Sequence, residues 1–150
     1  MKLQGQVKYC PGKRHCMRKK IKIAVSVVVL VFLLLVSGVI PTGKVKTHSE
    51  YYSDREINAA IFAARLYFAL EFRDCKLIEI DYAGDESIDA AKEWAKDANA
   101  SEAIILVSSF RSGSDWQSTG LEPDKIYQDW QWIMVKRLGF LWMHKTHGYG

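Results

Sequence analysis

An uninterrupted apolar run over residues 23–40, IAVSVVVLVFLLLVSGVI, limits what this chain can fold into more than any other feature. As a helix, its 18 residues would extend ~27 Å at ~1.5 Å per residue, close to the ~30 Å hydrocarbon layer of a bilayer. Lipid offers the backbone no hydrogen-bond partners, so a helix satisfies these amides and carbonyls despite the many valines. The run therefore predicts a transmembrane anchor, which Pro41 and Gly43 would end.

The charge distribution predicts the orientation of this anchor. Residues 1–22 contain 8 of the 21 Lys and Arg residues and no acidic residue. Because positive segments stay on the cytoplasmic side, we expect the amino terminus in the cytoplasm and residues 44–150 outside it. The predicted organisation is a basic cytoplasmic segment (1–22), the anchor (23–40), a linker (41–52) and an extracytoplasmic domain at the cell membrane (53–150).

Two other interpretations of the apolar run remain open. A cleaved signal peptide fits the small residues of Val36-Ser37-Gly38, but its hydrophobic region usually spans about 7–15 residues, which favours an uncleaved anchor. A buried helix of a soluble protein is disfavoured because no polar face interrupts the run. A bacterial lipoprotein box would need a cysteine where Val39 stands, so lipidation there is excluded.

Composition and cysteine use exclude several classes of partner. The chain has a net charge of +4, but the part after residue 22 has 13 basic and 17 acidic residues, so no nucleic-acid partner is expected. The membrane is the expected partner, and no cofactor is expected. Cys75 is the one cysteine of the outer domain, which excludes a disulfide within it. Cys10, His15 and Cys16 lack a fourth ligand and lie among positive charges, so no metal site is predicted.

The outer domain is expected to begin with an amphipathic helix near residues 54–72. Ser53 and Glu56 have the S-x-x-E spacing of a capping box, in which each side chain accepts a hydrogen bond from a free backbone amide. Helical periodicity then places one apolar stripe on the core side, formed by Ile57, Ile61, Ala64, Phe68 and Phe72.

The following segments predict two strands and a second helix. Residues 77–82 alternate, with Ile78, Ile80 and Tyr82 on the buried face. Residues 87–98 have a helical apolar pattern opened by Ser87 as the capping residue. Residues 103–107 are continuously apolar, which indicates a strand buried on both faces.

The rest of the chain predicts a long loop and a hairpin. Residues 111–125 are rich in Gly, Ser and Asp, and loops of this length often contain functional residues. YQDWQWIMVKR and FLWMHKTH then alternate across a turn at Leu138-Gly139, which predicts two paired strands. No βαβ alternation is present, so the predicted fold class is α+β, with helices on one face of a curved antiparallel sheet.

Several of these segments together resemble a known group of proteins. FRDCKLIEIDY, the strand SEAIILVSS, and a Trp-rich hairpin that ends in WMHKTHGYG resemble uncharacterised domains of membrane-anchored proteins and lipoproteins of Gram-positive bacteria. The resemblance extends over about residues 50–150. It implies a cystatin-like or NTF2-like fold, in which a long helix is cradled by a bent antiparallel sheet, and a location at the cell envelope, but no activity.

Aromatic side chains are the main candidates for a binding site. Trp132 and Tyr82 are predicted on the inner face of the sheet, where they either fill the core or line an apolar pocket. Trp116 lies in the polar loop, where an exposed indole suits a partner contact. His144 and His147 are three apart in a strand, so they are expected on opposite faces and not as a metal pair.

These features give two functional hypotheses. The first is a non-enzymatic envelope domain that binds a protein, peptide or small ligand, since no catalytic constellation is recognised. The second is an NTF2-like enzyme in which Asp81 or Glu79 acts as acid or base with Tyr82 or His144. A filled core would favour the first hypothesis, and a deep pocket with a carboxylate and a histidine would favour the second.

Overall fold

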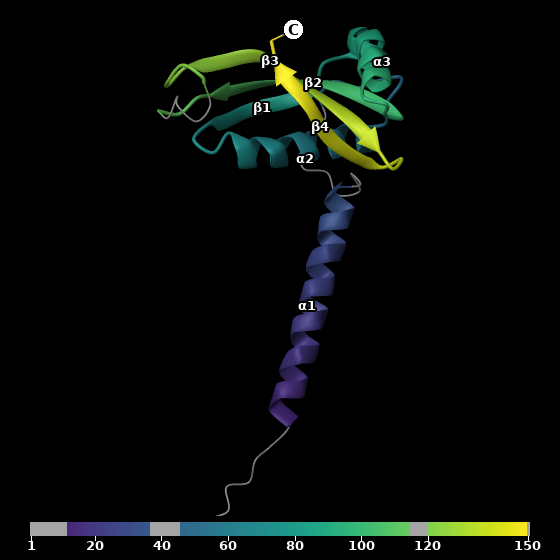
Figure 1. Cartoon of the computed structure of the whole chain (residues 1–150), viewed down its shortest axis with the longest axis vertical. Helices are drawn as coiled ribbons and strands as arrows, with labels where there is room; N and C mark the ends of the chain where they lie inside the picture. Colours follow the sequence, from purple (N-terminus) through teal and green to yellow (C-terminus); the bar gives the residue numbers. More distant parts are fainter. Residues whose placement is uncertain (1–11, 37–45, 115–119, 150) are drawn as a thin grey trace, which may run out of the picture. The chain divides into compact units, whose positions relative to one another are not determined.

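A computed structural model describes residues 12–36, 46–114 and 120–149, with the backbone alone for 12–20, 35 and 36. The chain divides into two compact units, Met1–Leu33 and Leu34–Gly150. The first contains most of helix α1 (Gly12–Val36), and the second contains the α+β domain (Figure 1).

Helix α1 includes most of the predicted anchor. Its side chains from Ile21 to Leu33 are all exposed. Within the described part of the chain, no helix combines the length and the hydropathy needed to cross a membrane. The last residues of the predicted anchor, 37–40, lie outside the described residues, and the anchor stays a prediction.

Helix α2 (Asp54–Glu71) confirms the predicted first helix of the domain. Its capping box is formed as expected: Ser53 Oγ accepts from the Glu56 amide, and the Glu56 carboxylate accepts from the Ser53 amide at 3.0 Å. The predicted apolar stripe from Ile57 to Phe72 is buried. Local capping and periodicity therefore define this element.

The domain contains one antiparallel sheet with the strand order β1-β2-β3-β4. The strands are β1 (Lys76–Tyr82), β2 (Glu102–Arg111), β3 (Ile126–Arg137) and β4 (Leu141–Gly148). The β3–β4 hairpin confirms the predicted turn, in which Leu138 and Gly139 have φ values of 52° and 76°. Two positive φ values are typical of a type I′ turn, whose twist matches that of the flanking strands.

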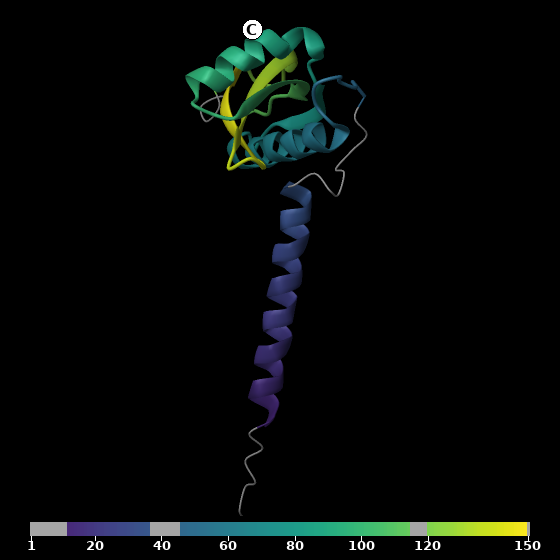
Figure 2. The same ribbon diagram turned by 90° about the vertical axis from the view of Figure 1, so that its right-hand side faces the viewer.

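The two helices of the domain lie on opposite faces of this sheet, as Figures 1 and 2 show. Leu106 and Trp132 pack with α2, whereas their neighbours Ile105 and Ile133 pack with Ala91 of helix α3 (Ile88–Asp97). The predicted α+β class is therefore confirmed, but the prediction of both helices on one face was wrong. Two helices cover opposite faces because β2 is apolar on both sides.

Two local predictions also need correction. Ile78 is 55% exposed because the β1–β2 register shifts between Leu77 and Glu79, which moves the strict alternation out of phase. Ser87 does not cap α3 through its side chain; it ends the short 3₁₀ helix η1 (Asp85–Ser87), and its hydroxyl donates to the Gly84 carbonyl at 2.6 Å.

The face of the sheet beneath α2 is filled with side chains. Trp132 is fully buried, and its indole Nε1 donates to Ser108 Oγ at 2.8 Å. The ring centroids of Phe68 and Phe72 lie 6.0 and 5.5 Å from that of Trp132, and Phe110 packs against these two phenylalanines at 5.5 and 5.7 Å. These aromatic side chains therefore fill the space between α2 and the sheet as part of the hydrophobic core.

Candidate functional site

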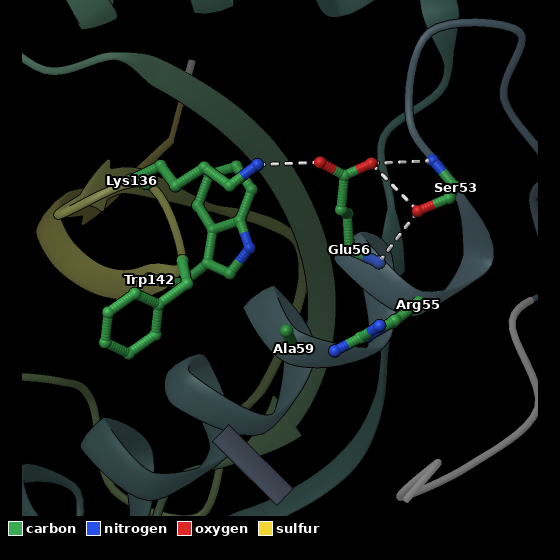
Figure 3. Close-up of a pocket in the computed structure, with 8 residues that line it drawn as sticks. Ser53, Arg55, Glu56, Ala59, Lys136 and Trp142 are labelled. Carbon is green, nitrogen blue, oxygen red and sulfur yellow. Dashed lines mark hydrogen bonds and ion pairs between the residues drawn. The ribbon is translucent and has the colours of Figure 1, made fainter. Parts of the chain in front are cut away.

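A cavity of about 290 Å³ lies where the start of α2 meets the β3–β4 hairpin. Figure 3 shows it with Lys136 and Trp142 on one side and the first turn of α2 on the other. Its lining consists of Ser53, Arg55, Glu56, Ala59, Lys136, Gly139, Phe140 and Trp142. The capping box and the type I′ turn therefore fix the two walls of this Lys136 cavity.

Lys136 is the central charged group of the cavity. Its side chain is only 9% exposed, and its Nζ donates to Glu56 Oε1 at 2.7 Å and to Glu102 Oε2 at 3.1 Å. The ammonium also lies over the ring of Trp142, its cross-strand neighbour, with Nζ 5.3 Å from the centroid of the indole. One ammonium group thus joins β3 to the first turn of α2.

Both partners of this ion pair are held in their charged forms. Burial lowers the pKa of Lys136, but hydrogen bonds to Glu56 and Glu102 outweigh it and leave the pKa raised. Burial raises the pKa of Glu56, but hydrogen bonds from Lys136 and Ser53 outweigh it and leave the pKa lowered. A proton-transfer catalyst needs a pKa near the working pH, so these groups suit binding better than acid–base chemistry.

A second, smaller cavity of about 150 Å³ lies at the opposite edge of the sheet, beside Glu79, Asp81 and Tyr82. The predicted linker closes over this region: the amides of Lys46 and Thr47 donate to Asp81 Oδ2 at 3.0 and 3.1 Å. Asp81 thus fixes the chain segment that precedes α2.

The structure describes two of the three residues that were predicted to bind a ligand or partner, Trp132 and Tyr82. Trp132 lies in the core, and Tyr82 is buried there too, although it also lines the smaller cavity and its hydroxyl lies 3.0 Å from Asp85. Trp116 lies outside the described residues. Their role in binding stays a prediction.

The structure brings together only some of the residues that the NTF2-like enzyme hypothesis requires. Glu79, Asp81 and Tyr82 share the smaller cavity on edge strand β1. His144 lies on the other edge strand, β4, and stacks on Tyr67 of α2, so it is on the opposite face from Asp81.

His144 and His147 are in direct contact, which contradicts the predicted separation. His147 Nδ1 lies 2.9 Å from His144 Nε2. Met134 pairs with His144 and Ile133 with Thr146, so Lys145 is an extra residue in β4. This bulge turns both imidazoles to the α2 face, and the prediction failed because it assumed regular alternation.

Sequence reasoning also missed Lys136. Trp132 and Met134 precede it at a period of two on the buried face, so its inward orientation was readable from the alternation. Its ion pairs were not readable in the same way, because the carboxylate partners lie 80 and 34 residues away in the chain.

No protein-family model, curated protein or solved structure matches this chain. Within the described residues, no group of three or more His, Cys, Asp or Glu side chains is placed to hold a metal ion. Cys10 of the amino-terminal ligand set lies outside the described residues, as do the side chains of His15 and Cys16.

Proposed function

We propose that this protein is a membrane-anchored envelope domain that binds a small ligand or a peptide side chain in the Lys136 cavity without converting it. The observation that supports this most is the pairing of a preformed cavity with an ion pair whose two members keep their charges. Binding sites typically combine an apolar wall with a few fixed polar groups, and cavities near 300 Å³ are at the lower end of their range.

The lining indicates the chemistry of the ligand. Trp142 and the half-exposed ring of Phe140 form an apolar wall, and the Glu56–Lys136 pair provides one acceptor and one cation within a few ångströms of it. The ligand would therefore combine an apolar or aromatic group with a polar group. Its size would be about that of one amino acid, given the volume of the cavity.

The proposed location depends on the amino-terminal third of the chain. Residues 23–40 would span the cell membrane once, residues 1–22 would remain in the cytoplasm, and the domain would lie outside. The exposed apolar side chains from Ile21 to Leu33 support this proposal, because a helix that is apolar all round suits a lipid environment.

We also propose a relationship to the cystatin-like or NTF2-like domains of Gram-positive envelope proteins. An 18-residue helix on a four-stranded antiparallel sheet supports it. Helix α3 on the opposite face goes beyond the simple helix-in-sheet arrangement that the resemblance implies.

The alternative function is an NTF2-like enzyme with a pocket carboxylate. The shared cavity of Glu79, Asp81 and Tyr82 favours it. Against it, Lys46 and Thr47 already donate to Asp81, and Lys46 Nζ lies 2.8 Å from Glu79 Oε2. Both carboxylates are thus bonded to the segment before α2, and the cavity has about half the volume of the Lys136 cavity, so binding at Lys136 is the stronger proposal.

Ligand-observed NMR tests the binding proposal on the full chain in detergent. The probes would be the aromatic amino acids and blocked dipeptides that contain them. We expect saturation transfer to one or more probes, loss of it in Phe140→Ala, and retention in the control Ile126→Ala, which removes a comparably exposed side chain from outside the cavity. Equal binding by both variants would place the ligand elsewhere.

Protease treatment of intact cells tests the location. Digestion of residues 46–150 without cell lysis would support the proposed orientation, whereas protection until lysis would contradict it.

Partner capture by crosslinking, compared between the native chain and variants of Trp116 and Trp132, tests the aromatic residues predicted from sequence.

A further inference from the structure

The bulge in β4 creates a pair of imidazoles that the proposed function does not use. His144 and His147 are paired with Met134 and Trp132 of β3, two residues that face α2. Their nitrogens, His144 Nε2 and His147 Nδ1, face each other at 2.9 Å. Both side chains are only partly buried, so the pair can be reached from solvent.

Aromatic rings fix the orientation of this histidine pair. Tyr67 stacks on His144 with a centroid separation of 3.7 Å and an interplanar angle of 16°. Phe72 and Trp132 each lie 5.2 Å from the ring of His147. The rings are thus held by packing, which preorganises their nitrogen atoms for a common ligand.

We propose that His144 and His147 form a two-imidazole binding site for a transition-metal ion such as Cu²⁺ or Zn²⁺. Bonds of ~2.0–2.1 Å at angles between square and tetrahedral separate two ligand nitrogens by ~2.8–3.4 Å. The observed 2.9 Å lies within this range, so the two nitrogens are spaced for a shared ion. In the hydrogen-bonded pair the facing nitrogens point at each other, and the bound ion requires each ring to turn until both lone pairs point at one position beside the N···N line.

The protonation state of the pair also suits a metal ligand. Burial and the neighbouring His147 lower the pKa of His144 to about 4, and burial lowers the pKa of His147. Both rings are therefore neutral at pH 7, as metal coordination requires. In the hydrogen-bonded pair one ring donates its N–H to the other. For both facing nitrogens to bind the ion, the proton of the donating ring moves to the other nitrogen of the same ring. Both facing nitrogens then have a free lone pair, and no proton is released.

The two histidines would leave coordination positions of the ion open to exchangeable ligands. The described residues place no third His, Cys, Asp or Glu ligand beside the pair, so the remaining coordination positions would be filled by water or by donors of another molecule. Imidazole suits copper and zinc, and Cu²⁺ binds more tightly than Zn²⁺ to a given set of ligands. We therefore expect Cu²⁺ to compete effectively with Zn²⁺.

Histidine-selective NMR of the full chain in detergent is the direct test. The chain has four histidines, and single variants His15→Gln and His48→Gln assign their ring resonances. On titration with ZnSO₄ at pH 7, we expect the ring protons of His144 and His147 to shift together with one binding curve. Shifts confined to His15 and His48, or no shifts, would overturn the proposal.

Substitution tests the same site with an independent readout. His147→Gln should weaken competitive Zn²⁺ binding by at least about tenfold, since loss of a ligand costs no less than loss of its supporting contacts. It should also remove Cu²⁺ quenching of the indole fluorescence, because Trp132 lies 5.2 Å from His147. The matched control, His48→Gln, should leave both unchanged, and equal effects of the two variants would contradict the assignment.

The zinc titration of the native chain tests the proposal even if the His147→Gln variant unfolds. The ring shifts of His144 and His147 are measured without any change at the site. Cu²⁺ provides a further check, since the electron paramagnetic resonance spectrum should contain hyperfine coupling to two imidazole nitrogens. A reduced copper hyperfine splitting together with a sulfur-to-copper charge-transfer absorption would instead indicate thiolate ligation by Cys10 or Cys16, and would identify the amino-terminal segment as the binding site.

Discussion

Lys136 Nζ and Glu56 Oε1 are 2.7 Å apart although the two residues are 80 positions apart in the chain. The contact joins the end of β3 to the first turn of α2, where Glu56 also completes the capping box. One carboxylate thus serves local helix capping and a long-range ion pair through its two oxygens.

Removal of the ammonium group should destabilise the domain. Lys136→Met keeps an unbranched side chain but removes the cation from Glu56, Glu102 and the Trp142 ring, so we expect a loss of about 1–2 kcal/mol in the free energy of unfolding. Urea unfolding of the full chain, followed by near-ultraviolet circular dichroism, measures it. Lys145→Met, which removes a longer and more exposed ion pair to Asp97, should have little effect.

Glu56 offers a test that separates its two roles. Glu56→Gln keeps an amide oxygen that can accept from the Ser53 amide, so it should lose mainly the ion pair. Glu56→Ala loses both contacts, and we expect it to cost about 1 kcal/mol more than Glu56→Gln in the same unfolding measurement. Equal losses for the two variants would show that the capping contact adds nothing to stability.

The ion pair should stabilise the domain only within a defined pH window. The pKa of Glu56 is lowered from 4.5, so its contribution is complete above pH 4.5 and is lost as the pH falls through the folded pKa. The pKa of Lys136 is raised from 10.5, so its contribution is complete below pH 10.5 and is lost at higher pH. The difference in stability between the native chain and Lys136→Met should thus be constant from pH 5 to 9 and shrink below pH 4.5.

His144 should make the domain sensitive to mild acid. Its pKa is lowered from 6.5 to about 4, so the unfolded chain takes up a proton between these values that the folded chain does not. Stability is therefore complete above pH 6.5 and falls toward pH 4, by on the order of 2 kcal/mol after allowance for solvent screening. Unfolding at pH 5 and 7 should show a smaller difference in His144→Gln than in the native chain or His48→Gln.

Much of the fold was readable from the sequence because its signals are local. The capping box of Ser53 and Glu56 and the period of the stripe from Ile57 to Phe72 depend on residues within a few turns of each other. The hairpin turn at Leu138-Gly139 is equally local. The signal that determines on which face α3 packs is not local, because it depends on contacts of Ala91 with Ile105 and Ile133 of two other elements.

The candidate sites were less accessible to sequence reasoning because they depend on irregular pairing. One extra residue in β4 places His147 on the opposite face from the one it would have in a regular strand. The sequence HKTH of residues 144–147 contains no feature that predicts a bulge. The Lys136 cavity joins residues from α2, β3, the hairpin turn and β4, which only the assembled domain brings together. Trp132 was correctly placed on the inner face, but only packing shows that the core is filled there.

The contact between Trp132 and Ser108 should contribute to the stability of this core. Ser108→Ala leaves the fully buried indole N–H without its acceptor, and we expect a loss of about 1–3 kcal/mol in the free energy of unfolding. Ser109→Ala is the matched control, because Ser109 is the adjacent residue of β2 and is less buried. A loss as large in the control would mean that strand packing, and not the hydrogen bond, is responsible.

The hairpin turn contains a residue that does not suit its backbone. Leu138 has a φ of 52° and is 83% exposed, so its side chain gains little burial in return for a left-handed conformation. Asn adopts this conformation more readily, and Asn-Gly is a preferred type I′ sequence. Leu138→Asn should therefore raise the free energy of unfolding by up to about 1 kcal/mol, measured by urea unfolding. Leu138→Val, a β-branched residue, should lower it. A loss of stability in Leu138→Asn would mean that the packing of the leucine side chain outweighs the strain of its backbone.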